Sequence, residues 1–234
     1  MPSVKKQSVL PHHVGIIPDG NRRWAKEHGL PSFVGHQKGL EQQKALITAS
    51  LALGIEMVTL WGFSTENWKR SEQEVSFLMK IFEQLALDES EGLNRRGIRI
   101  RVFGNIDQLP KSLQRILTRV IEKTQTNTKL SVNYCLSYGG RDEILRAIKR
   151  IVTEKKRPED ITEEVFASYL DSAGLPDPDL VIRTSGEQRL SGFMPWQTVY
   201  SELYFAPLHF PDFSPEEFQK AIDWYGDRKR RFGK

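Results

Sequence analysis

The sequence has almost no cysteine and no long hydrophobic run. Cys135 is the single cysteine in 234 residues, so no internal disulfide can form, which fits a reducing compartment. The polar start Met1–Gln7 is not followed by an apolar segment, so it does not have the pattern of a secretory signal. No stretch approaches the roughly 20 apolar residues that cross a bilayer. We therefore expect a cytoplasmic protein whose contact with a membrane is at most peripheral.

Several catalytic signatures are also missing. The chain has no GxxxxGK(S/T) segment, no Cys/His spacing typical of zinc and no GxSxG turn. This excludes Walker-type nucleotide sites, zinc centres and the nucleophile elbow of hydrolases. The Asp-Asp-x-x-Asp sequence that clamps magnesium in trans-type prenyl synthases is absent as well. The net charge of +4 comes from basic residues mixed with acidic ones, so we expect no nucleic-acid partner.

Apolar runs with strand character alternate with helical stretches along the chain. The strand-like runs are Val14–Ile17, Ile55–Phe63, Ile98–Phe103, Leu130–Leu136 and Asp179–Ile182. The helical stretches are Gln37–Leu53, Glu72–Arg95, Lys111–Lys123 and Asp142–Lys155. A short helix begins at Thr162, and another begins with Ser214 as its N-cap and runs toward Arg231. This pattern predicts one α/β domain over residues 1–234, with a mainly parallel sheet flanked by helices and with residues 1–11 flexible.

The stretch Glu72–Arg95 is apolar on more than one side. Its apolar residues form one stripe at helical spacing and additional surface beside it: Val75, Leu78, Met79, Phe82 and Leu85, then Phe77, Ile81 and Leu87. A helix of this kind needs two partners. One is the sheet, and the other is a neighbouring helix, a dimer partner or an apolar ligand.

The most informative run is Pro18-Asp19-Gly20-Asn21-Arg22-Arg23-Trp24, which joins a strand to a helix through a tight turn. The carboxylate of Asp19 can hold a magnesium ion. Free backbone N–H groups and the guanidinium groups of Arg22 and Arg23 can hold phosphate. The run therefore predicts a diphosphate-handling site at a strand end.

Two further polar segments follow strands, which is where ligands bind in α/β sheets. The first runs from Ser64 to Arg70 and offers hydroxyl, amide and guanidinium groups; helix capping is the alternative role for Ser64 and Ser71. The second runs from Arg183 to Gly192, and its two arginines and Ser191 suit a diphosphate. Solvated surface charge is the alternative there.

Two isolated residues have two possible roles each. Glu202 lies among large apolar residues, where a carboxylate needs a partner. That partner is either a cation in a salt bridge or a magnesium ion shared with Asp19. His36 lies at an expected helix start, where it is either a cap or surface residue or a contact to phosphate.

Taken in order, these segments resemble the cis-prenyltransferases, the undecaprenyl diphosphate synthase (isoprenyl transferase) family. The matching text begins with His13–Ala25, Gly35-His36 and Phe63–Trp68. It continues with Tyr138-Gly139-Gly140-Arg141, Asp179–Arg189, Trp196-Gln197, Glu202–Ala206 and Arg228–Gly233. The resemblance covers nearly the whole chain.

The resemblance implies a six-stranded, largely parallel sheet with an apolar product tunnel, in a homodimer. The implied reaction joins isopentenyl diphosphate to an allylic diphosphate such as farnesyl diphosphate, forms a cis double bond and releases diphosphate. Asp19 and Glu202 would bind Mg²⁺, and Asn67 would act in proton removal. The allylic diphosphate and the site around it would involve Gly20, Asn21, Arg22, Arg23, Trp24, Ser32, His36, Ser64, Thr65, Glu66, Trp68 and Arg70. Isopentenyl diphosphate would be held by Arg183, Arg189, Leu190 and Ser191.

Some positions depart from the family pattern. Ser32 stands where most bacterial members carry an arginine, and Arg22, where many members have glycine, is a candidate replacement for that phosphate contact. Pro18 replaces a usual methionine, and Gly192 replaces a usual asparagine. The small Gly62 favours a medium or long product, while Phe77, with Ile81 and Leu85, is a candidate wall of the tunnel.

Two other functions compete with the enzyme. One is a catalytically silent partner or lipid-binding relative, and the other is a generic phosphate-binding α/β protein. Because the chain keeps Asp19, Arg183, Arg189 and Glu202, we expect an active enzyme.

Overall fold

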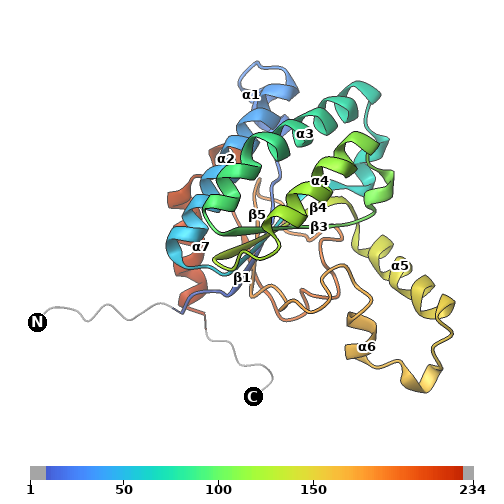
Figure 1. The fold of residues 1–234 in the computed structure, drawn as a ribbon. Helices are drawn as coiled ribbons and strands as arrows, with labels where there is room; N and C mark the ends of the chain where they lie inside the picture. Colours follow the sequence, from blue (N-terminus) through green and yellow to red (C-terminus); the bar gives the residue numbers. More distant parts are fainter. Residues whose placement is uncertain (1–8, 229–234) are drawn as a thin grey trace, which may run out of the picture.

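Six parallel strands form one sheet in the order β3-β4-β2-β1-β5-β6 in the computed structural model, which describes residues 9–228 (Figure 1). The strands are β1 (His13–Ile17), β2 (Met57–Ser64), β3 (Ile98–Phe103), β4 (Leu130–Tyr138), β5 (Leu180–Arg183) and β6 (Glu202–Phe205). All five pairings between neighbours are parallel. The predicted α/β class and the mainly parallel sheet are therefore confirmed. The expected flexibility of residues 1–11 falls largely on residues 1–8, which lie outside the described residues.

Helices connect the strands as the alternation predicted. They are α1 (Asn21–Glu27), α2 (Ser32–Leu53), α3 (Glu72–Arg95), α4 (Lys111–Thr124), α5 (Gly140–Thr153), α6 (Glu163–Ala167) and α7 (Pro215–Gly226). Short 3₁₀ turns η1 (Thr65–Lys69), η2 (Ile106–Gln108), η3 (Pro158–Asp160) and η4 (Phe210–Asp212) complete the described elements. None of these helices is both long enough and apolar enough to span a bilayer.

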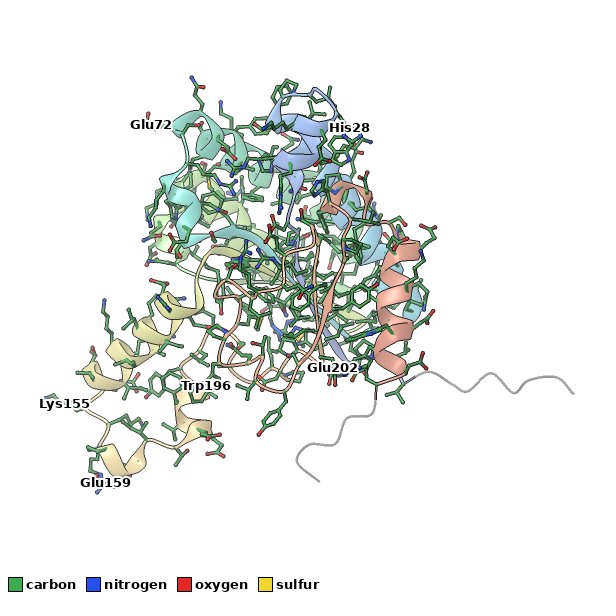
Figure 2. The ribbon with its side chains drawn as sticks, turned by 180° about the vertical axis from the view of Figure 1, so that it is seen from behind. His28, Glu72, Lys155, Glu159, Trp196 and Glu202 are labelled. Carbon is green, nitrogen blue, oxygen red and sulfur yellow. The ribbon has the colours of Figure 1, made fainter. Side chains whose placement is uncertain are left out.

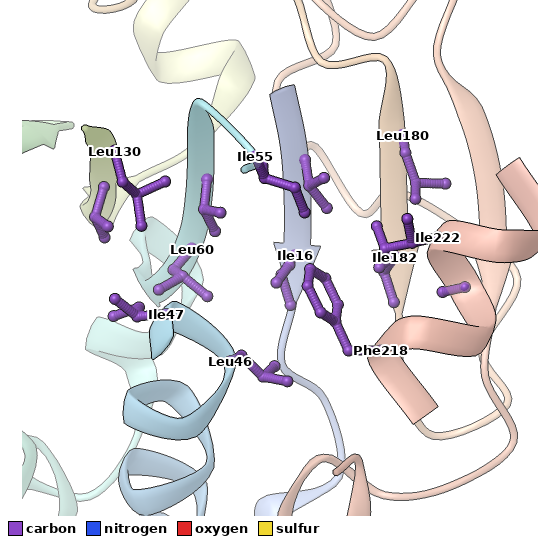
Figure 3. Close-up of a cluster of buried hydrophobic side chains, with 14 of the residues drawn as sticks. Ile16, Leu46, Ile47, Ile55, Leu60, Leu130, Leu180, Ile182, Phe218 and Ile222 are labelled. Atoms are coloured by element: carbon purple, nitrogen blue, oxygen red, sulfur yellow. The ribbon is translucent and has the colours of Figure 1, made fainter. Parts of the chain in front are cut away.

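One face of the sheet is covered by helices. Ile16, Leu60 and Ile182 point from the strands toward Leu46 of α2 and Phe218 of α7 (Figure 3). Their neighbours Ile17, Trp61 and Val181 belong to a cluster on the other face, because successive strand residues point to opposite sides. That second cluster includes Phe193 and Met194, from the segment between β5 and β6. Both faces of the central strands are thus buried, as expected for a parallel sheet.

Side-chain caps determine where several helices begin. The hydroxyl oxygens of Ser71, Thr162 and Ser214 accept hydrogen bonds from backbone N–H groups three residues later, at the starts of α3, α6 and α7. The three predicted starts are confirmed. The end of α7 is not: it lies at Gly226, five residues before Arg231.

Candidate active site

A cavity lies at the carboxyl ends of the central strands. β1 separates β2 from β5, and Ile17 at its end is in register with Arg183 at the end of β5. Asp19 follows β1, and Ser64 ends β2. The cavity, called here the outer cavity, is lined by Asp19, Asn21, His36, Ser64, Asn67, Arg70, Arg183 and Ser191 on its polar side. Three predicted segments therefore meet at the carboxyl ends of the parallel strands, where α/β folds bind ligands.

Asp19 and Arg183 form the central ion pair of the site. Nη2 of Arg183 donates to Oδ2 of Asp19 at 2.9 Å, and Nη2 of Arg23 lies 3.2 Å from Oδ1. Partial burial opposes ionisation of Asp19, but the hydrogen bond and charge of Arg183, with the charge of Arg23, outweigh it. The pKa of Asp19 is consequently below its usual value. The carboxylate is charged at neutral pH and faces the outer cavity.

Arg183 is held from its other side as well. Its Nη1 donates to the Ser191 hydroxyl at 2.8 Å and to the backbone carbonyl of Arg189. Its Nε is buried and has no hydrogen-bond partner. Glu187 accepts hydrogen bonds from both Arg23 and Arg189. The loop after β5 is thus tied to α1 by charge, and the guanidinium groups of Arg23 and Arg183 both contact Asp19.

The turn at Gly20 allows α1 to approach the loop after β5. Gly20 has φ +98°, a conformation that L side chains rarely adopt. A Cβ there would lie 2.5 Å from both Ser185 Oγ and His209 Nδ1, which are themselves 2.6 Å apart. Thr184 donates its hydroxyl proton to the Asp19 carbonyl oxygen at 2.8 Å. The glycine is therefore required by both backbone conformation and space.

A second group of charges lies at the mouth of the site. Nη1 of Arg70 donates to Oε1 of Glu74 at 2.9 Å, and Nε2 of His36 lies 3.3 Å from the same oxygen. Nη1 of Arg22 lies 3.6 Å from Oε2. We call Arg22, His36, Arg70 and Glu74 the Glu74 cluster. It joins α1, α2 and the start of α3 around a single carboxylate.

Ser64 and Asn67 cap the turn η1 and line the outer cavity. The backbone N–H of Ser64 donates to Oδ1 of Asn67 at 3.0 Å, and the Ser64 side chain caps the turn in return. The capping role is confirmed, and both residues still border the cavity. This pairing orients the amide of Asn67 at the end of β2.

The outer cavity continues into apolar surroundings. Its deeper lining contains Leu78, Ile81 and Phe82 of α3. Phe82 also borders a second cavity, the inner cavity, with Ile47, Leu85, Leu117 and Leu136 among its other walls. Gly62 lies at the boundary, because a Cβ there would be 3.0 Å from Leu136 Cδ2 and 3.7 Å from Phe82 Cε1. These residues of α3 thus face the cavities, and Leu117 of α4 borders the inner one.

Several predicted residues do not line the outer cavity. Trp24 donates its indole N–H to Asp212 at 2.8 Å, and Trp68 donates to Ser137 at 2.9 Å, so both indoles hold elements together. Glu66 is exposed and pairs with Lys69. Thr65, Leu190 and the exposed Arg189 are also outside the outer-cavity lining, while Ser32 borders a surface groove beside His36.

Phe77 was expected to form a wall of the tunnel, but it borders neither the outer nor the inner cavity. Its ring contacts Phe33 of α2, with ring centres 5.7 Å apart, and lines the surface groove that contains Ser32. Ile81 and Leu85 do border the outer and inner cavities respectively. Phe77 lies one turn before Ile81 on the same side of α3, closer to the start of the helix and beside the Ser32 groove.

Within a single chain, Asp19 and Glu202 lie too far apart to share the expected magnesium ion. Glu202 begins β6 in register with Leu180, whereas Asp19 lies beyond the level of Arg183 and Phe205. Glu202 is therefore at least three residues from Asp19 along the strand direction and two strands away across the sheet, which together correspond to about 14 Å. Glu202 accepts a hydrogen bond from Arg228 at 3.1 Å, so within one chain it has the cationic partner of a salt bridge. Figure 2 shows Glu202 far from the end that carries His28 and Glu72.

Sequence reasoning missed Glu74, Glu187 and Thr184 as parts of the site. Glu74 lies three residues after the cap Ser71, where a glutamate normally indicates a capping box. Its spacing of four residues from Arg70 was the available sign of an ion pair. Within residues 9–228, no group of three His, Cys, Asp or Glu side chains could hold a metal. The single carboxylate of Asp19 is compatible with Mg²⁺, because this ion commonly binds one or two carboxylates together with substrate phosphates.

Comparison with known proteins agrees with this arrangement. The family model "Putative undecaprenyl diphosphate synthase" matches residues 17–233. Isoprenyl transferases are similar over nearly the whole length: that of Clostridium perfringens is 43% identical over 97% of this chain and 91% of its own. The enzyme of Thermotoga maritima is 46% identical over 96% of this chain and 97% of its own. The crystal structure of lavandulyl diphosphate synthase from Lavandula x intermedia, in complex with dimethylallyl diphosphate, superposes with a TM-score of 0.93 at 37% identity, covering 96% of this chain and 99% of that one.

Proposed function

Because the chain is a prenyltransferase of the undecaprenyl diphosphate synthase family, we propose that it condenses isopentenyl diphosphate with an allylic prenyl diphosphate. The product is a cis-polyprenyl diphosphate, and diphosphate is released. The observation that carries this proposal is the position of the Asp19–Arg183 pair. It lies at the polar end of a cavity whose deeper walls are apolar.

The basic groups of the site divide into two diphosphate subsites. Gly20, Asn21, Arg22, Arg23, His36 and Arg70 are proposed to surround the allylic diphosphate. Arg183 and Ser191, with the more exposed Arg189, are proposed to hold isopentenyl diphosphate. Their guanidinium groups would stabilise the negative charge that develops on the leaving oxygens when the allylic C–O bond breaks. Arg183 touches Asp19, so the two subsites share one boundary.

Mg²⁺ fits the polar end of the outer cavity as a proposed cofactor. Asp19 would hold it, with phosphate oxygens of the substrate as further ligands. When bound, the ion supplies charge stabilisation to the leaving diphosphate. The low pKa of Asp19 means that no proton has to be removed from the carboxylate at neutral pH.

The proton that leaves after condensation requires an acceptor near the new bond. Asn67 lies at the end of β2 with its Oδ1 bound to the Ser64 backbone N–H. This contact fixes the amide beside the outer cavity. We assign Asn67 to orienting the substrate or the released diphosphate for proton removal. A carboxamide oxygen is too weak a base to take the proton itself.

The hydrocarbon tail of the product is proposed to grow along α3. Leu78, Ile81 and Phe82 continue from the polar end, and Phe82 separates the outer from the inner cavity. Each CH₂ group buried there contributes about 0.8 kcal/mol. Apolar walls also keep water from the allylic cation before isopentenyl diphosphate reacts with it.

The active form is proposed to be a homodimer. Leu145, Ile148 and Val152 are exposed at helical spacing on α5, and β6 is an edge strand of the sheet. A second copy of the chain is the occupant we expect on this side, because an isologous dimer pairs the same surface on both subunits. Light scattering should give about 54 kDa, twice the 27.0 kDa of one chain. A mass of one chain would contradict the dimer, and Leu145→Glu should produce that mass if α5 is in the interface.

A product assay tests the proposed reaction. Purified protein is incubated with farnesyl diphosphate, labelled isopentenyl diphosphate and Mg²⁺, and the products are sized after removal of the diphosphate. We expect a ladder or a single length of labelled polyprenol. Absence of product with primers of several lengths would instead favour the catalytically silent partner or lipid-binding subunit. Peripheral membrane contact and a cytoplasmic location stay predictions.

A further inference from the structure

Glu74 occupies the position where an anionic ligand would bind the basic groups at the mouth of the site. Its carboxylate accepts from Arg70 at 2.9 Å and lies 3.3 Å from His36 and 3.6 Å from Arg22. The Glu74 side chain is 16% exposed, so these contacts shield most of it from water. Both carboxylate oxygens are used.

The geometry of these contacts is also suited to a phosphate group. A guanidinium group binds carboxylate and phosphate oxygens with the same N–H donors. Arg70 and His36 line the outer cavity, and Arg22 lines the adjoining groove around Asp19. A diphosphate at the mouth and the Glu74 carboxylate would therefore compete for the same donors.

The basic groups need a counter-charge when no ligand is bound. Burial lowers the pKa of Arg70, and the charge of Arg22 lowers it further, while Glu74 raises it. For His36, burial and the two arginines lower the pKa, whereas Glu74 raises it. Glu74 thus offsets part of the repulsion among these partly buried basic groups.

We propose that Glu74 is an internal counter-anion, bound to Arg22, His36 and Arg70 in the free enzyme and displaced from them when a diphosphate binds. The identity of the displacing anion rests on the function proposed above. Displacement has a consequence for the rest of the site. Glu74 belongs to the first turn of α3, and Leu78 and Phe82 follow it at spacings of four and eight residues on the same side of that helix.

Binding of the diphosphate would therefore release one end of the helix that lines the hydrocarbon path. In the free enzyme the Glu74 contacts hold the first turn of α3 against α1 and α2. When the ligand replaces the carboxylate, that turn keeps the Ser71 cap but loses its charge contacts. Occupation of the diphosphate subsite is thereby coupled to the position of Leu78 and Phe82.

The test is calorimetric titration of inorganic diphosphate, at fixed Mg²⁺, into the wild type and two variants. Glu74→Gln keeps the side-chain shape and removes the competing charge. Glu72→Gln is the matched control, because it removes one charge from the same helical turn but leaves the three ion pairs of Glu74 in place. We expect Glu74→Gln to bind diphosphate about threefold to tenfold more tightly, and Glu72→Gln to bind like the wild type.

Weaker or unchanged binding in Glu74→Gln would overturn the displacement, since Glu74 would then orient the basic groups or be irrelevant to them. Equal tightening in both variants would overturn it as well, because a general charge effect would then explain the result. Circular dichroism and thermal unfolding of both variants confirm that the helix is intact. A wild type that binds diphosphate but forms no prenyl product would overturn the proposed condensation and leave the displacement standing.

Discussion

Gly35 of α2 lies directly against the backbone carbonyl of Asn21 in α1, and a Cβ at Gly35 would be 2.0 Å from that oxygen. The two helices therefore touch through backbone atoms at this point. Because Asn21 follows Gly20 and Gly35 precedes His36, the contact sets the distance between the Asp19 turn and the Glu74 cluster. A similar approach occurs one turn later, where a Cβ on Gly39 would lie 2.7 Å from Asn21 Oδ1.

Gly35→Ala is expected to separate α1 from α2. The methyl group would meet backbone, which cannot rotate away, so the unfolding free energy should fall by about 1–3 kcal/mol and the condensation rate should fall with it. Gly92→Ala is the control, because Gly92 lies within α3 with nothing within 4 Å of the added Cβ. That variant should be equally stable or more stable, by up to about 1 kcal/mol. Urea unfolding of both variants gives the comparison, and equal stability would contradict the packing argument.

Asp19→Asn is expected to lower the condensation rate by at least about 100-fold. The substitution removes the metal-binding charge and leaves Arg183 without its charged partner, while the side chain keeps its size. Steady-state kinetics with farnesyl diphosphate and isopentenyl diphosphate measure the effect. Asp160→Asn, in an exposed ion pair with Arg157, should leave the rate unchanged. A rate in Asp19→Asn close to that of the wild type would eliminate Asp19 from the mechanism.

The buried His13 should make stability fall in mild acid. Nδ1 of His13 must donate to the Pro176 carbonyl at 2.8 Å, so Nε2 accepts from the Thr59 hydroxyl at 2.7 Å and the ring is neutral. Burial lowers the pKa of His13 from 6.5 to about 4. The unfolded chain therefore binds a proton at this ring more readily than the folded protein does. The stability that the neutral His13 ring contributes is complete above pH 6.5 and is lost as the pH falls toward 4.

The size of this loss follows from the difference between the two pKa values. About 2.5 units at about 1.36 kcal/mol each correspond to about 3 kcal/mol. Urea unfolding between pH 7 and pH 4 measures it, and NMR titration of the ring measures the pKa directly. In His13→Gln, which cannot titrate, the loss in acid should be smaller by about that amount. A ring that titrates near 6.5 in the folded protein would refute the argument.

Phe82→Ala is expected to lengthen the products. The ring stands between the outer and inner cavities, so its removal joins them into one apolar space. Phe77→Ala is the matched control, because that ring packs on Phe33 and borders neither cavity. Gly62→Leu should act in the opposite direction, since the added side chain would fill the boundary beside Leu136. Product sizing checks all three, and longer products from Phe77→Ala would show that the tail follows another path.

The local elements were readable from the sequence because their signals are local. The predicted bounds Ile98–Phe103 and Glu72–Arg95 coincide with β3 and α3. Ser71 and Ser214 cap helices where the sequence placed them. Asp19, Ser64 and Arg183 could be brought to one site because each follows a buried strand, and parallel strands end at the same edge.

Other relationships depend on which elements become neighbours. One predicted role of Glu202 is a magnesium ion shared with Asp19, but the register of β6 with β5 places Glu202 at the opposite end of the strands within one chain. Phe77 and Ile81 lie four residues apart on the same side of α3, so the sequence could not tell that Ile81 borders the outer cavity while Phe77 contacts Phe33 of α2. Glu74 occupies a capping-box position three residues after Ser71, and only the approach of α1 and α2 makes it the centre of a charge cluster.

The sequence by itself therefore determined the strands, the helices and the diphosphate chemistry of the Asp19 run. Those depend on propensities, caps and residue types within a few positions of one another. The tertiary structure alone decided that Arg183 meets Asp19, that Arg228 meets Glu202, and that Glu74 meets three basic side chains. Contacts of that kind join residues up to 164 positions apart. Strand register and helix packing determine them, and neither is encoded in the spacing of residues along one element.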